Sequence, residues 1–214
     1  MNRKQATAFT SLLVVVILAA LAWYLDRGET TATAPPATGD SANQLAALVI
    51  APEGKMAGYS RDRFPHWASQ GNSCDTREIV LQKQGADVRS DKDCKAVSGT
   101  WVSPYDGLTI TDAGSIDIDH TVPLAEAWRS GASTWVDEDR KKFANDLGGI
   151  QLIAASATTN RAKGDQDPAK WKPAVTTYWC TYAQNWIAVK ATYKLTIDQA
   201  EHDALASMLT SCSP

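Results

Sequence analysis

The stretch that decides the fold runs from residue 115 to residue 124 and reads SIDIDHTVPL. Apolar and polar side chains alternate up to His120, which predicts a β-strand over residues 115–120. Because neighbouring side chains of a strand point to opposite faces, Asp117 and Asp119 share one face, and His120 lies on the other unless the strand ends there. A carboxylate beside an imidazole at the end of a strand can hold a metal ion next to a base.

About forty positions further on, residues 159–165 (TNRAKGD) carry a second group of polar side chains. Asn160 offers an amide oxygen that can bind a hard cation, whereas Arg161 and Lys163 carry positive charges that suit phosphate oxygens. A buried strand is expected before this group, at residues 150–155. A strand bearing Asp and His, a loop, and then a helix bearing Asn form a ββα-metal arrangement.

In combination, D-I-D-H-x-V-P-L and N-R-x-K-G-D resemble the motifs of the HNH, or His-Me finger, endonucleases. Similar members include the nuclease domain at the C-terminus of GmrSD-type restriction enzymes and its secreted actinobacterial homologues. The resemblance extends over about residues 59–212 and includes CDTRE at residues 74–78, SGTWVSPYDG at residues 98–107 and VPLAEAWRSGA at residues 122–132. D-x-D-H alone would be a weak signal, but the two motifs together are fairly specific.

The resemblance implies a role for each residue of the two motifs. His120 would be the general base that deprotonates water, and Asp119 and Asn160 would bind one divalent ion, Mg²⁺ or Mn²⁺. Asn145 matches, less strictly in its spacing, the middle asparagine that orients the histidine loop in this family. The implied activity is hydrolysis of phosphodiester bonds in DNA, with RNA as an alternative substrate.

Three cations are candidates for contacting substrate phosphates: Arg161, Lys163 and Arg77. A solvated surface is the alternative for Arg161 and Lys163, and an ion pair with a nearby acid is the alternative for Arg77. An Asp-His pair is often a structural hydrogen bond, and Asn160 by itself would also suit a helix N-cap. The two motifs together favour the catalytic interpretation.

The N-terminus predicts export from the cytoplasm. Residues 6–25 form an uncharged run that would be about 30 Å long as a helix, which matches the hydrocarbon core of a bilayer. Two basic residues precede the run, so the rest of the chain is expected outside the cytoplasm. Residues 1–27 are therefore a transmembrane anchor or a cleaved signal peptide, and both alternatives stay open. Residues 28–43 predict a flexible linker, and residues 44–214 the nuclease domain.

Export makes disulfides the expected state of the four cysteines. Three pairings are possible, and we favour the two that join sequence neighbours, Cys74 with Cys94 and Cys180 with Cys212. Each would stabilise the fold by roughly 3 kcal/mol in the chain-entropy model. A four-thiolate zinc site is a weak alternative, because the sequence has no C-x-x-C motif.

Hydrophobic periodicity and turn residues predict the remaining elements. Strands are expected at residues 77–82, 97–102 and 108–111, and helices at residues 123–131, 137–145 and 156–160, after Pro173, and after a capping box of Thr196 and Gln199. Aromatic residues recur at helical spacing between residues 175 and 193, which favours core packing over a base-stacking surface. The predicted fold is α+β: a short antiparallel hairpin and a metal-bearing helix, wrapped by C-terminal helices and pinned by two disulfides.

The composition limits how a nucleic acid can bind. Lys and Arg number 21 against 24 Asp and Glu, so the net charge of −3 excludes a strongly basic coat. The sequence contains no helix-turn-helix, zinc finger or basic arm, so we expect little base specificity. We predict a metal-dependent endonuclease outside the cytoplasm, either secreted or anchored to the membrane by its N-terminal helix. The alternative is a catalytically inactive, anchored envelope or binding protein that retains the fold.

Overall fold

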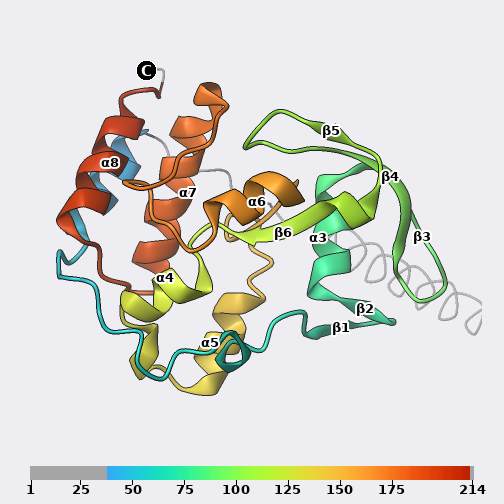
Figure 1. The fold of residues 1–214 in the computed structure, drawn as a ribbon, viewed down its shortest axis with the longest axis horizontal. Helices are drawn as coiled ribbons and strands as arrows, with labels where there is room; N and C mark the ends of the chain where they lie inside the picture. Colours follow the sequence, from blue (N-terminus) through green and yellow to red (C-terminus); the bar gives the residue numbers. More distant parts are fainter. Residues whose placement is uncertain (1–37, 213–214) are drawn as a thin grey trace, which may run out of the picture. The chain divides into compact units, whose positions relative to one another are not determined.

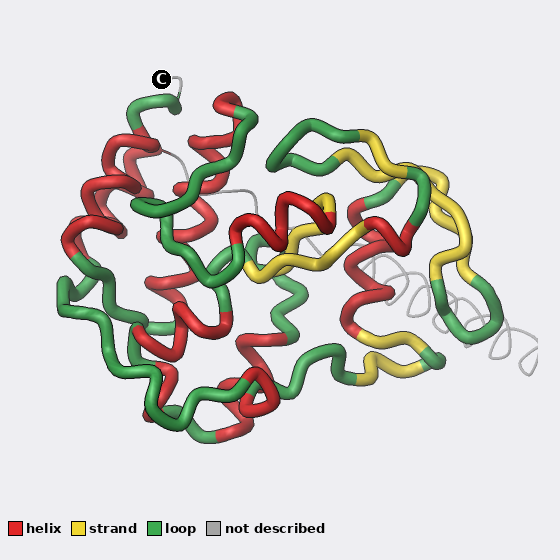
Figure 2. The backbone as a smooth tube through the Cα atoms, viewed as in Figure 1, coloured by secondary structure: helices red, strands yellow, loops and turns green. Residues whose placement is uncertain are grey.

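The computed structural model describes residues 38–212, which form an α+β domain (Figures 1 and 2). The helices are α2 (Thr38–Ala47), α3 (Thr76–Gln84), α4 (Leu124–Arg129), α5 (Asp137–Ala144), α6 (Ala157–Lys163), α7 (Trp179–Thr192) and α8 (Gln199–Leu209). The strands are β1 (Ser69–Gly71), β2 (Cys74–Asp75), β3 (Ala86–Ser90), β4 (Ala96–Val102), β5 (Thr109–Ile110), β6 (Ile116–His120) and β7 (Leu152–Ser156). They form small antiparallel sheets in the orders β1-β2, β3-β4-β5 and β6-β7. The predicted fold class is confirmed at this level.

The sheet β6-β7 and the helix α6 form the centre of the domain. Ile116 pairs with Ser156 at one end of the sheet, and His120 pairs with Leu152 at the other. Ser156 is also the N-cap of α6, because its hydroxyl accepts a hydrogen bond from the backbone amide of Thr159. The helix therefore starts where β7 ends and lies along β6 (Figure 1).

The predicted strand at residues 77–82 is wrong, because this segment belongs to α3. Asp75 caps the helix by accepting the backbone amide of Glu78, a local start signal that outweighs the apparent alternation of the following residues. Val80 and Leu81 are adjacent in sequence and both buried, which a half-buried strand would not allow. The strand β3, which the sequence did not predict, follows directly after this helix.

The last helix begins later than predicted. Asp198, rather than Thr196, is its N-cap and accepts the backbone amide of Glu201 at 2.8 Å. Thr196 instead donates from both its amide and its hydroxyl to the carbonyl of Ser130. The motif D-x-x-E at this position is therefore the start signal, and its glutamate points into the core.

The folded domain begins before the predicted residue 44, because residues 38–43 already belong to α2. Ser41 and Leu45 of this helix are buried where α2 packs against α7 and α8. The predicted anchor or signal segment at residues 1–27, and residues 28–37 of the predicted linker, lie outside the described residues. Between residues 38 and 212, no helix is long and apolar enough to cross a membrane.

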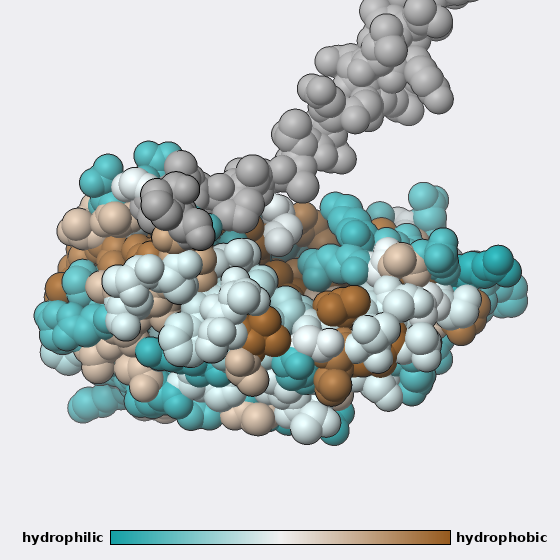
Figure 3. Space-filling model, turned by 90° about the horizontal axis from the view of Figure 1, so that it is seen from above, coloured by the Kyte–Doolittle hydropathy of each residue, from teal (hydrophilic) through white to brown (hydrophobic). Residues whose placement is uncertain are grey.

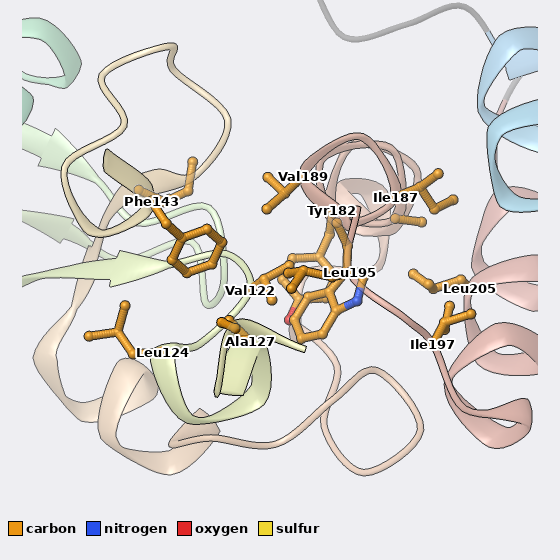
Figure 4. Close-up of a cluster of buried hydrophobic side chains, with 14 of the residues drawn as sticks. Val122, Leu124, Ala127, Phe143, Tyr182, Ile187, Val189, Leu195, Ile197 and Leu205 are labelled. Atoms are coloured by element: carbon orange, nitrogen blue, oxygen red, sulfur yellow. The ribbon is translucent and has the colours of Figure 1, made fainter. Parts of the chain in front are cut away.

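The larger hydrophobic core lies between α4, α5, α7 and α8 (Figure 4). Tyr182 and Trp186 from the aromatic stripe of α7 are fully buried in it, which confirms the prediction of core packing. A second core lies between α3 and the strands β4, β6 and β7, and it contains Leu81, Trp101 and Ile118. On the face shown in Figure 3, the hydrophobic areas are separated from one another mostly by residues of intermediate hydropathy.

The structure contains the two predicted disulfides. Cys74 and Cys94 have their Cα atoms 5.1 Å apart and join β2 to the loop between β3 and β4. Cys180 and Cys212, with Cα atoms 4.9 Å apart, join the first turn of α7 to the segment after α8. The second bond closes a loop of 32 residues, so it is worth about 3–4 kcal/mol of unfolding free energy in the chain-entropy model.

A buried charge cluster ties α4, α7 and α8 together. The ammonium of Lys190 lies 2.8 Å from a carboxylate oxygen of Glu126 and 3.0 Å from one of Glu201, and all three side chains are buried. Glu126 also pairs with Arg129, at 2.9 Å, so Lys190 is the cation that the two acids share. Burial raises the pKa of Glu201 from 4.5 to about 7, although Lys190 opposes the shift.

This cluster predicts a pH-dependent stability. A carboxyl whose pKa is raised by folding binds its proton more tightly in the folded state, so its contribution is complete below about pH 4.5 and is lost as the pH rises through about 7. Glu201→Gln mimics the protonated form. Relative to this variant, the wild type should lose up to about 3 kcal/mol of unfolding free energy between about pH 5 and pH 8. Urea unfolding at both pH values measures the difference, with the exposed Glu138→Gln as control. Equal pH dependence in wild type and Glu201→Gln would contradict this account.

Candidate active site

The end of β6, the start of α4 and the helix α6 enclose a cavity of about 270 Å³. The predicted residues Asp119, His120, Asn160 and Arg161 all line it, and so does Arg61 from the segment before β1. The sequence therefore predicted most of a set of side chains that the fold brings to one place.

His120 stands at the last position of β6 and is 4% exposed. Its Nε2 atom lies 2.9 Å from the carbonyl oxygen of Ala144. Because a carbonyl only accepts, Nε2 must carry the proton, and Nδ1 is left as the basic nitrogen. Nδ1 has no hydrogen-bond partner among residues 38–212. Burial lowers the pKa of His120 to about 3, so the ring is neutral at physiological pH.

The ring of His120 is also held from its face. The indole of Trp67 stacks on it, with the ring centroids 5.8 Å apart and an interplanar angle of 21°. The segment that carries Trp67 is held by Asn145, at the C-terminal end of α5. The side-chain amide of Asn145 donates to the carbonyl of Pro65 at 2.7 Å, and its oxygen accepts from the amide of Ala68 at 2.8 Å.

Asp119 is buried and has two donors on one oxygen. The hydroxyl of Tyr105 and the ammonium of Lys163 each lie 2.6 Å from Oδ2. Lys163 also donates to the carbonyl oxygen of His120, at 2.8 Å. Burial raises the pKa of Asp119, and the nearby ammonium opposes this shift. The other oxygen, Oδ1, accepts no hydrogen bond from the part of the chain that the structure describes, so it is free for a ligand in the cavity.

Asn160 lies one turn before Lys163 on α6. Its amide nitrogen donates to Oδ2 of Asp117 at 3.2 Å, which leaves the amide oxygen available. The guanidinium Nε of Arg161 lies 3.5 Å from the same carboxylate oxygen, and the side chain of Arg161 is 75% exposed. Asp117 is the second residue of β6 and lies on the same face of the strand as Asp119. Its carboxylate therefore orients the side chain of Asn160.

The first turn of α6 is fixed from the loop before β5. The hydroxyls of Ser156 and Thr159 both donate to one carboxylate oxygen of Asp106. Partial burial raises the pKa of Asp106, but hydrogen bonds that include these two outweigh it and hold the pKa below its usual value. The position of Asn160 relative to β6 is thus set both by the direct connection to β7 and by this contact.

Two predicted phosphate contacts do not reach the cavity. Lys163 is fully buried, with its ammonium on Asp119 and the backbone of His120, so it has no access to a substrate. Arg77 donates to the carbonyls of Ala113 and Ile116, each at 2.9 Å, and these bonds hold its guanidinium at the start of β6, away from the cavity. Both predictions are corrected: these cations are structural. The sequence shows that these residues are cations, but it does not show which way their side chains point.

Comparisons with known proteins identify the family of this chain. The sequence profile of the C-terminal domain of GmrSD restriction endonucleases matches residues 75–208, which include β6, α5 and α6. This chain belongs to that family. The GmrSD C-terminal family is nuclease-related, so a nucleic acid is the implied substrate class.

The chain is also similar to a protein from Arthroderma benhamiae that is described as an uncharacterized secreted protein. It is 50% identical over 177 residues, which cover 83% of this chain and 87% of the relative. No solved structure matches the chain.

The cavity of this GmrSD C-terminal domain fits a hard divalent cation by the chemistry of its donors. Asp119 supplies a carboxylate oxygen that accepts no hydrogen bond within residues 38–212, and Asn160 supplies an amide oxygen. Oxygen donors suit Mg²⁺ or Mn²⁺, whereas structural zinc prefers thiolates and imidazoles. The four cysteines are all in disulfides and offer no thiolate.

Proposed function

We propose that this chain is a metal-dependent endonuclease that hydrolyses phosphodiester bonds of DNA, with RNA as an alternative substrate. In this proposal, β6, β7 and α6 are the ββα-metal core of a His-Me finger nuclease. The observation that carries the proposal is the contact of His120 Nε2 with the carbonyl of Ala144, which leaves Nδ1 without a hydrogen bond within residues 38–212, in a residue that lines the same cavity as Asp119 and Asn160. A buried histidine with a purely structural role would normally use both ring nitrogens.

The residues divide the chemistry between them. His120 accepts a proton from the attacking water at Nδ1, and Nε2 keeps its hydrogen bond to Ala144 throughout. Asp119 and Asn160 would hold one Mg²⁺ or Mn²⁺ ion. When bound, this cation neutralises charge that develops on the phosphate and on the leaving oxygen. Arg161 is exposed at the mouth of the cavity and would contact a non-bridging phosphate oxygen.

In this proposal, Asn145 does not touch the reacting groups but positions residues that do. Its neighbour Ala144 accepts from His120, and its side chain holds the segment that carries Trp67. It corresponds to the middle asparagine expected from the sequence. Its hydrogen bonds are all to protein groups, so it is a positioning residue rather than a ligand of the cation.

Export to the outside of the cytoplasm is part of the proposal. The secreted relative and the two disulfides support it, because disulfides persist in oxidising compartments. The chain's net charge of −3 means that affinity for nucleic acid comes from local cations and the metal rather than from a basic coat. Little sequence specificity is expected for the same reason.

Removal of metal tests the proposal directly. We expect plasmid cleavage to stop after exhaustive chelation and to return on addition of Mg²⁺ or Mn²⁺ alone, because the cation is held by only two protein oxygens. Asp119→Ala and Asn160→Ala should both lose activity, and higher Mn²⁺ should partly rescue Asn160→Ala. The exposed Asn43→Ala on α2 is the control. Undiminished cleavage in chelator would contradict the metal site, and inactivity with every metal would favour the inactive binding protein.

A further inference from the structure

The backbone of Trp67 adopts an unusual conformation next to the cavity. Its φ angle is +58°, in the left-handed region that large side chains rarely adopt. Asn72 and Ser73 also have positive φ angles, of 51° and 62°, but they form the two-residue turn between β1 and β2, where such angles are required. Trp67 lies in no hairpin turn. An outlier of this kind persists only where the surroundings enforce it, and such outliers cluster at functional sites.

Asn145 enforces the conformation of Trp67 from both sides. Its amide nitrogen binds the carbonyl of Pro65, two residues before the indole, and its oxygen binds the amide of Ala68, directly after it. The hydroxyl of Thr76 donates to the same oxygen at 2.7 Å and so fixes the Asn145 side chain itself. Asn145 therefore holds the segment 65–68 on both sides of Trp67, the residue of this segment with the unfavourable backbone conformation.

The clamp places the indole on the ring of His120. The two rings are nearly parallel, at 21°, with centroids 5.8 Å apart. The hydrogen bond from Nε2 to Ala144 fixes one edge of the imidazole, but a single hydrogen bond leaves the ring free to tilt about it. The stacked indole fixes the plane. Ala144 accepts the hydrogen bond from the ring edge, and its neighbour Asn145 holds the segment whose indole stacks on the ring face. The C-terminal end of α5 therefore controls both the edge and the plane of the imidazole.

We propose that Trp67 is the positioning residue of His120: it holds the imidazole plane so that Nδ1 stays directed at the cavity in a single tautomer. This inference rests on the proposed function for its kinetic consequence, but its structural content does not need the chain to be a nuclease. A purely structural role is the competing explanation, because Trp67 also packs against the second hydrophobic core.

Two substitutions separate these explanations. Trp67→Leu keeps an apolar side chain for the core but removes the flat ring, whereas Trp67→Phe keeps a ring. Trp135→Leu is the matched control, because Trp135 is also partly buried and its ring packs against Phe143 and Tyr193 rather than against His120. The chain has 3 histidines, so the ring signals of His120 in long-range ¹H–¹⁵N spectra are assigned by their loss in His120→Ala. The spectra are recorded on the metal-free protein and report the tautomer of His120 without any cleavage.

We expect wild type, Trp67→Phe and Trp135→Leu to show His120 as one Nε2-protonated tautomer. Trp67→Leu should show a second tautomer or exchange broadening, and its kcat should fall by about 10-fold to 100-fold with KM changed less than about 3-fold. A single Nε2-protonated tautomer and wild-type kcat in Trp67→Leu would overturn the inference. If the wild type cleaves nothing, the proposed function fails, but the spectra still decide the role of Trp67.

Discussion

Replacing His120 with alanine is expected to lower kcat/KM for DNA cleavage by roughly 10²–10⁴-fold, the contribution usual for a general base. The variant should still fold. It loses the donor to the buried carbonyl of Ala144, and an unsatisfied buried acceptor costs about 1–3 kcal/mol of unfolding free energy. Steady-state cleavage of a labelled duplex and thermal unfolding measure the two effects on the same preparation.

His202→Ala is the matched control for this substitution. His202 lies on α8, and within the described chain its side chain has one hydrogen bond, to its neighbour Asp203. Its replacement should leave both cleavage and stability unchanged within error. If His120→Ala retained wild-type kcat/KM while His202→Ala behaved as expected, the assignment of the base would be wrong.

Lys163→Met is expected to have the largest effect on stability. The ammonium of Lys163 is fully buried against Asp119, so the substitution leaves a buried carboxylate without its counter-ion. Removal of one partner of a buried ion pair costs about 3–5 kcal/mol. Cleavage should fall as well, because Oδ2 of Asp119 loses one of its two donors and the carboxylate that would bind the cation is no longer held.

A second substitution separates stability from chemistry. Asp119→Asn combined with Lys163→Met removes both charges, so the double variant should be more stable than Lys163→Met alone and still inactive. Lys142→Met is the control, since the ammonium of Lys142 lies 3.6 Å from a carboxylate oxygen of Asp139 and both side chains are exposed. Urea unfolding gives the free energies. A Lys163→Met variant as stable as the Lys142→Met control would show that the pair is not energetically important.

The centre of the fold was predictable because its signals are local. Alternation over residues 115–120 gave β6, the following proline marked α4, and a buried run gave β7 within two residues. The wrong strand at residues 77–82 has a local cause too. Its apolar run fits the period of a strand as well as that of a helix, and the N-cap at Asp75 decides for a helix.

The site was predictable only in part. Asp119, His120 and Asn160 were found because two short motifs contain them, and the antiparallel pairing of β6 with β7 brings the motifs together. Trp67 and Tyr105 were missed, since they reach His120 and Asp119 from loops whose position is set by tertiary contacts. Lys163 lies three residues after Asn160 and so on the same face of α6, a spacing that could have indicated its contact with β6.

The most direct test of the account compares wild type and His120→Ala, expressed and purified in parallel as the full chain, on supercoiled plasmid in Mg²⁺. The account predicts that the wild type converts the plasmid to open-circular and linear forms and that His120→Ala leaves it supercoiled over the same period. Parallel purification matters because a contaminating nuclease would cut in both samples. Equal cleavage by the two proteins, or none by the wild type with either Mg²⁺ or Mn²⁺, would contradict the claim that His120 and its cavity form a nuclease active site.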